Sequence, residues 1–140
     1  MTAPSIAATT LYRPVGLKEL EIIHKSGMRA FPPRLYWQPI FYPVTSREYA
    51  VRIAEDWNTK DEASDYMGFV LEFALPQDYL AQFPVQMVGG RQAQELWIPA
   101  ERLEEFNAQI IGKITVRDVF AGARAPVRTD ALTLLPLGWV

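Results

Sequence analysis

The chain contains no cysteine and only one histidine among its 140 residues. The lack of cysteine excludes disulfide bonds and thiolate metal centres, and it gives no sign of an oxidising compartment. A single histidine argues against a metal site built from several imidazoles, so no metal is expected. No apolar run reaches the length of a membrane span, and residues 1–10 lack the features of a signal peptide. We expect a cytoplasmic protein with no membrane partner, or one exported by a route that leaves no such mark.

A large excess of charge of one sign is absent as well. The 14 basic and 16 acidic residues give a net charge of −2, and the isoelectric point is about 5.4. Such a surface does not attract a nucleic-acid backbone over a wide area, so nucleic-acid binding is not expected. Hydrophobic residues make up 49% of the chain and charged residues 21%, which is typical of a folded globular protein.

Helices and short strands are mixed irregularly along the chain, which predicts a single α+β domain over residues 10–120. Residues 1–9 are small and polar and are expected to form a flexible terminus. Residues 121–140 form a Pro/Leu-rich tail whose apolar end is expected to dock on the domain, or else to engage a partner chain. The expected strands are 10–15, 38–44, 68–75, 85–88 and 113–119, and the expected helices are 17–26, about 46–57 and 99–107.

The stretch from Gly89 to Pro99 combines a Gly-Gly turn with a short alternating run. Because strand side chains alternate between faces, Glu95 and Trp97 share one face, and the residues that separate and follow them form an apolar face. An acid beside an indole, on a strand after a flexible turn, suits a small-molecule cleft. The same pattern also suits an exposed edge strand. The two glycines are not a phosphate-binding loop, since the required Lys and Ser/Thr are missing.

Two other places carry polar groups that need a partner. Arg13 lies in a short, mostly apolar strand between Tyr12 and Pro14. Its guanidinium must therefore reach water, a carboxylate or a ligand anion, and a structural salt bridge is the simplest of these. Thr45 and Ser46 mark the passage from a strand to a helix, where free N–H groups suit anions. Helix capping alone also explains these two hydroxyls.

Two further patterns are explained by ordinary structure. His24 lies on an apolar helix face, which predicts a partly buried histidine, and no catalytic triad can be built around it. The acidic residues between positions 56 and 65 match the spacing of no calcium-binding loop, and a lysine lies among them. They are predicted to form a solvated loop.

Three short motifs follow one another along the chain. The first is Leu-Tyr-Arg at 11–13 in an early strand, and the second, Phe-x-x-x-Thr-Ser at 41–46, runs into a helix with alanines. The third is Glu95 followed by Leu-Trp-Ile-Pro. This order resembles the mono-ADP-ribosyltransferases of the arginine–serine–glutamate type. The resemblance implies an α+β fold with a small split sheet, mixed or antiparallel, and flanking helices.

Residues 10–119 as a whole also resemble a group of small bacterial proteins labelled as ADP-ribosylation-related. The phrases that carry this resemblance are Leu-Tyr-Arg-Pro-Val-Gly-Leu-Lys-Glu-Leu, Phe-Pro-Pro-Arg, Ile-Phe-Tyr-Pro-Val, Asp-Trp-Asn-Thr-Lys and Gln-Glu-Leu-Trp-Ile-Pro-Ala-Glu. A larger, all-helical and metal-dependent glycohydrolase family shares the same label. This chain is too short for that family and too rich in strands.

The resemblance implies that NAD is a substrate and that ADP-ribose is transferred or hydrolysed. Glu95 would be the catalytic residue and would accept a hydrogen bond from the 2′-hydroxyl of the nicotinamide ribose. Breaking the nicotinamide–ribose bond develops positive charge on the sugar, which a fixed carboxylate stabilises. The implied NAD-binding residues are Arg13 for a phosphate or the ribose, Thr45 and Ser46 for the nicotinamide-ribose pocket, and Tyr42 or Trp97 for stacking on nicotinamide.

The sequence departs from the family pattern in two places. The hydroxyl motif reads Pro-Val-Thr-Ser rather than Ser-Thr-Ser, and Ala93 stands where relatives carry Glu or Gln. The second departure leaves the acceptor undefined, including whether it is a protein. The alternative function is a catalytically inactive module with the same fold that binds a protein or a nucleotide. An accessory protein of a bacterial toxin is a further possibility that no particular residue favours.

Overall fold

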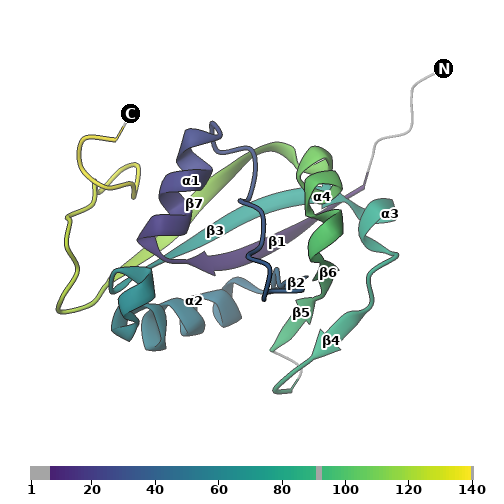
Figure 1. Ribbon diagram of the computed structural model, residues 1–140, viewed down its shortest axis with the longest axis horizontal. Coiled ribbons are helices and arrows are strands. Elements are labelled where there is room, and N and C mark those ends of the chain that lie inside the picture. Colours follow the sequence, from purple (N-terminus) through teal and green to yellow (C-terminus); the bar gives the residue numbers. More distant parts are fainter. Residues whose placement is uncertain (1–6, 91–92, 140) are drawn as a thin grey trace.

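A computed structural model describes residues 7–90 and 93–139 of the chain. It has the expected α+β fold, in which a central antiparallel sheet is flanked by helices and by a separate hairpin (Figure 1). The sheet has the order β1-β3-β7 and is formed by β1 (Ala8–Val15), β3 (Met67–Pro76) and β7 (Ile111–Ala121). No helix in the described part of the chain is both long and apolar enough to cross a membrane.

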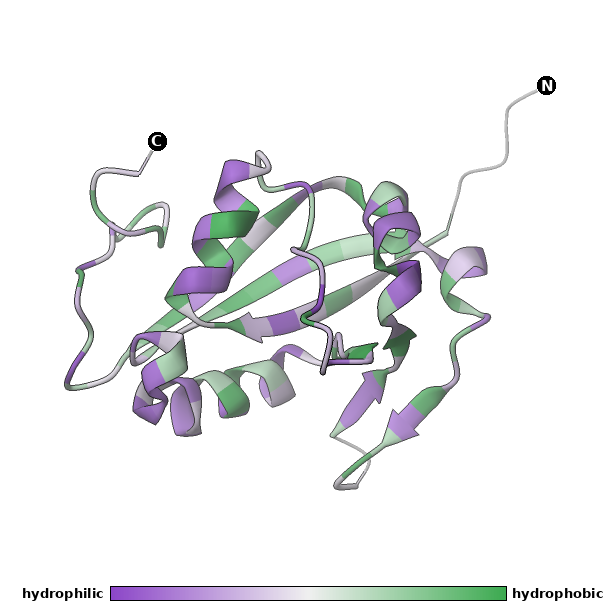
Figure 2. Ribbon diagram, in the orientation of Figure 1, coloured by the Kyte–Doolittle hydropathy of each residue, from purple (hydrophilic) through white to green (hydrophobic). Residues whose placement is uncertain are grey.

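Strand β3 lies at the centre of the sheet because its sequence is apolar on both faces. Phe69, Leu71 and Phe73 point to one face and are buried. Val70, which lies between the first two, is buried on the opposite face. A strand covered on both sides needs a nearly continuous apolar run, and Figure 2 shows largely apolar colours along β3.

Helices cover the two faces of the sheet unequally. Helices α1 (Leu17–Lys25) and α4 (Leu103–Gln109) lie on one side of the sheet and α2 (Arg47–Asp56) lies on the other (Figure 1). Helix α2 packs closely because β3 carries Gly68 at the contact: a β-carbon there would come within 2.7 Å of the carbonyl oxygen of Ala54. The close packing fixes the position of α2 across β1 and β3.

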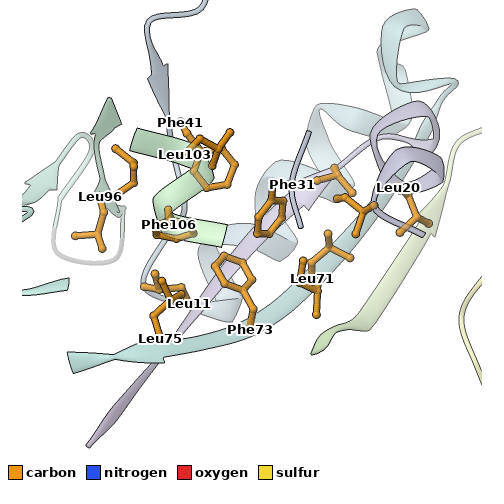
Figure 3. Close-up of a cluster of buried hydrophobic side chains, with 14 of the residues drawn as sticks. Leu11, Leu20, Phe31, Phe41, Leu71, Phe73, Leu75, Leu96, Leu103 and Phe106 are labelled. Atoms are coloured by element: carbon orange, nitrogen blue, oxygen red, sulfur yellow. The ribbon is translucent and has the colours of Figure 1, made fainter. Parts of the chain in front are cut away.

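An aromatic cluster fills the core on the side of α1 and α4 (Figure 3). Phe31 lies with its ring centroid 4.9 Å from that of Phe41 and 4.8 Å from that of Phe73. The rings of Phe41 and Phe106 are 5.5 Å apart. The side chain of Asn107 pairs with the backbone of Phe31, accepting from its N–H at 2.9 Å and donating to its carbonyl at 3.0 Å. The cluster therefore joins α4, the sheet and the loop that follows α1.

Val44 bridges the hairpin and the sheet. It pairs with Tyr12 of β1 on one side and with Glu95 of β5 on the other. The expected strand 38–44 is wrong in extent, since only β2 (Ile40–Phe41) is regular and it pairs with β6 (Ile98–Pro99). The chain has proline at positions 39 and 43, and these residues cannot donate to a ladder.

Short elements complete the described chain. Hairpin strands β4 (Val85–Met87) and β5 (Gln94–Leu96) pair in antiparallel fashion. The predicted loop after α2 contains two short 3₁₀ turns, η1 (Asn58–Lys60) and η2 (Glu62–Ser64). Helix α3 (Gln77–Leu80) follows β3, and the 3₁₀ turn η3 (Ala100–Arg102) leads into α4.

The C-terminal tail packs on the domain at some of its apolar residues. Leu135 and Trp139 lie against the main core, and the ring of Trp139 is 4.9 Å from that of His24, which is half-buried on α1. Leu132 and Leu137 remain exposed. The tail thus combines a docked segment with an apolar surface that faces solvent.

Candidate functional site

One cavity brings together four of the six residues that the sequence assigned to a site. It has a volume of about 510 Å³ and contains Glu95, Arg13, Tyr42 and Trp97. The described residues that line it are Arg13, Pro14, Arg34, Tyr42, Val44, Ile53, Trp57, Glu95 and Trp97. We call this space the Glu95 cavity. Its volume lies within the range of about 300–1,000 Å³ that is usual for small-molecule sites.

The backbone ladder around Val44 explains why residues so distant in sequence meet here. Tyr12 and Val44 exchange two backbone hydrogen bonds of 2.9 and 2.8 Å. On its other side this segment is bound to β5, because the N–H of Leu96 donates to the carbonyl of Pro43 at 2.9 Å. Residues 42–44 therefore lie between β1 and β5, with Arg13 on one side and Glu95 on the other.

Glu95 lies half-buried in the cavity with its carboxylate held at one oxygen. Its Oε1 accepts a hydrogen bond of 2.8 Å from the indole Nε1 of Trp97. The other oxygen accepts from no residue in the described chain. The expected division of faces is confirmed, since Leu96 and Ile98 are buried. Burial and, to a smaller extent, the charge of Glu95 raise the pKa of Tyr49 on α2.

Two aromatic rings lie beside Glu95. The rings of Tyr42 and Trp97 meet edge to face with their centroids 6.1 Å apart. Both are partly exposed, at 37% and 40%. Because the indole N–H of Trp97 is engaged by Glu95, the orientation of its ring is fixed relative to the carboxylate. Rings that are fixed and still accessible can pack against a planar ligand.

Arg13 forms the salt bridge that was the simplest expectation for it. Its Nε and Nη2 donate to the two carboxylate oxygens of Glu19 at 2.8 and 3.0 Å, and its Nη1 donates to the carbonyl of Tyr42 at 3.4 Å. The guanidinium carbon lies 4.6 Å from the centroid of the Phe41 ring. Only 12% of the side chain is exposed. Arg13 therefore borders the cavity as a rigid, largely saturated group.

Thr45 and Ser46 lie directly after Val44, at the start of α2, and do not line the Glu95 cavity. The hydroxyl oxygen of Ser46 accepts a hydrogen bond of 3.1 Å from the N–H of Tyr49, which is a helix cap. The hydroxyl of Thr45 donates to the carbonyl of Gln94 at 3.5 Å. In the structure these two residues hold α2 and β5 in place beside the cavity.

Sequence reasoning did not assign Arg34 or Trp57 to the site. Both line the Glu95 cavity, and Trp57 is 59% exposed where it ends α2. Burial, followed by the positive charge of Arg13, lowers the pKa of Arg34. The phrases Phe-Pro-Pro-Arg and Asp-Trp-Asn-Thr-Lys contained the signal, but they were interpreted as a loop and as one side of an amphipathic helix.

Side chains of the acidic loop after α2 form hydrogen bonds within the loop. Asp61 accepts a hydrogen bond of 2.6 Å from the hydroxyl of Ser64. Among residues 7–90 and 93–139, no three His, Asp or Glu side chains are grouped so that they could hold a metal ion.

No family model, curated protein or solved structure matches the chain.

Proposed function

We propose that the chain binds NAD in the Glu95 cavity and transfers or hydrolyses its ADP-ribose part. One observation carries the proposal: a carboxylate, a guanidinium and two aromatic rings from three distant segments line the same cavity. These are Glu95, Arg13, Tyr42 and Trp97, the same residues to which the ADP-ribosyltransferase resemblance assigns roles. The same resemblance implies that the α+β fold is ADP-ribosyltransferase-like, with a small split sheet.

The reaction needs a negatively charged group held in a fixed position, and the carboxylate of Glu95 is such a group. When the C1′–N bond of NAD breaks, its electron pair leaves with nicotinamide, and C1′ of the ribose becomes electron-poor. A carboxylate held in place stabilises this charge without having to reorganise. One oxygen of Glu95 is oriented by Trp97, and the other is available to the ribose 2′-hydroxyl. The attacking water or acceptor then bonds to C1′ and releases a proton.

The aromatic lining suits the leaving group. Nicotinamide is a flat, positively charged ring in NAD, and the faces of Trp and Tyr attract such cations. Tyr42 and Trp97 lie beside Glu95, so a ring stacked there would place its bond to ribose close to the carboxylate. Thr45 and Ser46 contribute to this proposal by fixing the adjoining start of α2.

A module that binds without catalysis is the second candidate, and a specific residue favours it. Ala93 is buried at the position where the resembling transferases carry Glu or Gln. A methyl group there can neither orient nor activate an acceptor. Such a module would retain the cavity for a nucleotide, and the exposed apolar residues of the tail, Leu132 and Leu137, offer a surface for a protein.

Two measurements on the unmodified protein separate these candidates. The protein is mixed with NAD, nicotinamide release is followed by mass spectrometry, and the melting temperature is recorded with increasing NAD. We expect release, together with stabilisation of about 2.7 kcal/mol at a hundred times the dissociation constant. A raised melting temperature without release would assign the chain to the binding module. If neither signal appears, the NAD proposal is contradicted.

A further inference from the structure

The Glu95 cavity adjoins a second cavity of about 290 Å³. Four residues line both spaces: Arg13, Pro14, Arg34 and Trp57. The second cavity extends past Glu19 to the turns after α2, where it includes Asn58, Asp61 and Ser64. The two arginines therefore lie where the two cavities adjoin, and we call the two cavities together the groove. A ligand longer than the Glu95 cavity would pass these arginines.

Arg34 has donors to offer at this junction, whereas most of those of Arg13 are used. The Nε of Arg34 donates to the carbonyl of Ile40 at 3.1 Å, which holds the side chain in place. Its two terminal nitrogens donate to no residue that the structure describes, and no described carboxylate forms an ion pair with it. Arg13, by comparison, has both oxygens of Glu19 and the carbonyl of Tyr42.

Both guanidinium groups lie against the same buried ring. The guanidinium carbons of Arg13 and Arg34 are 4.6 and 6.0 Å from the centroid of Phe41. The carboxylate of Glu19 forms a salt bridge with Arg13, and its negative charge also acts on Arg34. Partial burial of two neighbouring cations with one shared anion is costly, and the pKa of Arg34 is lowered by burial and by Arg13. A second anion at the terminal nitrogens of Arg34 would relieve this cost.

We propose that Arg34 is the phosphate-binding residue of the groove. The phosphate would lie at the junction, on the side of the Glu95 cavity. Asp61, the carboxylate further along the second cavity, already accepts a hydrogen bond from Ser64. The identity of the ligand as the diphosphate of NAD or ADP-ribose rests on the proposed function. The anion site itself needs no catalysis.

The distribution of charge along the groove agrees with such a ligand. Glu95 forms no ion pair with a described cation, and Arg34 forms none with a described carboxylate. A ligand with a cation at one end and a diphosphate further along would satisfy both. NAD has this arrangement, because its nicotinamide ring is positive and its diphosphate is negative.

The test uses calorimetric titration of the full chain with ADP-ribose, with inorganic pyrophosphate, and with nicotinamide riboside, which has no phosphate. Arg34→Gln should weaken the binding of ADP-ribose and pyrophosphate about tenfold or more. It should leave nicotinamide riboside unaffected. Arg34→Lys should recover part of the loss, since it restores the charge but not the planar fork. Arg29→Gln, which removes one exposed charge outside both cavities, should bind all three within about twofold of the wild type.

The results that would overturn the inference differ from those that would overturn the proposed function. If Arg34→Gln folds and binds ADP-ribose like the wild type, or if pyrophosphate does not bind the wild type, the phosphate role of Arg34 is wrong, even where NAD is cleaved. If pyrophosphate binding depends on Arg34 but no nicotinamide is released from NAD, the anion site is supported and the enzymatic function is contradicted. If Arg34→Gln does not fold, Arg34→Lys is compared with the wild type instead. Pyrophosphate binding equal to that of the wild type would mean that the guanidinium of Arg34 does not bind the phosphate through its paired N–H donors.

Discussion

Replacement of Glu95 by glutamine should lower the rate of nicotinamide release from NAD by about a hundredfold or more. The expected magnitude is that of losing one fixed group that stabilises transition-state charge. Glutamine has nearly the same shape as glutamate, and its side-chain oxygen can still accept the hydrogen bond that Trp97 donates at 2.8 Å. The substitution therefore removes the negative charge with little change in packing. NAD should still bind, because the remaining lining of the cavity is intact.

Nicotinamide release is measured at saturating NAD for the wild type, Glu95→Gln and a matched control, Glu104→Gln. Glu104 is an exposed acid in the first turn of α4 and lines a different cavity. Its replacement removes one charge at a distance from Glu95, so the rate should change less than about twofold. A Glu95→Gln protein that retains most of the wild-type rate would mean that the carboxylate does not take part in bond cleavage.

Replacement of Phe106 by alanine should lower the free energy of unfolding by about 3–5 kcal/mol, because it leaves a cavity in a packed core. Phe106 is fully buried on α4. Its ring lies 5.5 Å from that of Phe41, 6.2 Å from that of Phe73 and 6.4 Å from that of Tyr79. Truncation would remove three aromatic contacts at once and leave the surrounding rings without support.

The effect of Phe106→Ala is measured by urea unfolding, with Ile22→Ala as the control. Ile22 is 50% exposed on α1, so its truncation should cost no more than about 1 kcal/mol. Phe106→Ala should also loosen the packing around the Glu95 cavity, because Phe106 packs on Phe41 and Phe41 lies against the guanidinium of Arg13. A loss below about 1 kcal/mol for Phe106→Ala would show that α4 does not hold the aromatic cluster together.

The elements with a strong local pattern were predictable from the sequence. The alternation around Phe69 and Leu71 located β3, and the spacing of apolar residues located α1 and α2 close to their observed ends. Residue type alone placed the N-cap of α2 at Thr45 or Ser46, and the structure has it at Ser46. In each of these cases the residues that form the element lie next to one another, so local chemistry is sufficient.

The parts that were not predictable depend on contacts between distant residues. The strand expected over 38–44 is shortened to two residues between two prolines. Beyond it, Val44 forms isolated bridges with Tyr12 and Glu95. No local pattern shows that Val44 pairs with both β1 and β5. The same limit hid Arg34, which enters the site only because the loop after α1 folds back over Phe41.

The four predicted site residues that share a cavity illustrate what sequence reasoning can and cannot give. The resemblance named Arg13 and Glu95 as members of one site, and the structure lines one cavity with both. It did not reveal that Arg13 would be bound by Glu19 on both of its carboxylate oxygens. That pairing depends on the position of α1 against β1, which is decided by tertiary packing.

The indole N–H signals of the tryptophans in an NMR spectrum give the most direct measurement of NAD binding in the Glu95 cavity. Trp97 donates its indole hydrogen to Glu95, and Trp57 lines the same cavity. Trp139 packs on His24 outside that cavity and serves as an internal control. Titration with NAD should shift the Trp97 and Trp57 signals saturably and leave that of Trp139 in place. Signals of Trp97 and Trp57 that stay unchanged up to millimolar NAD would contradict a nucleotide site at Glu95.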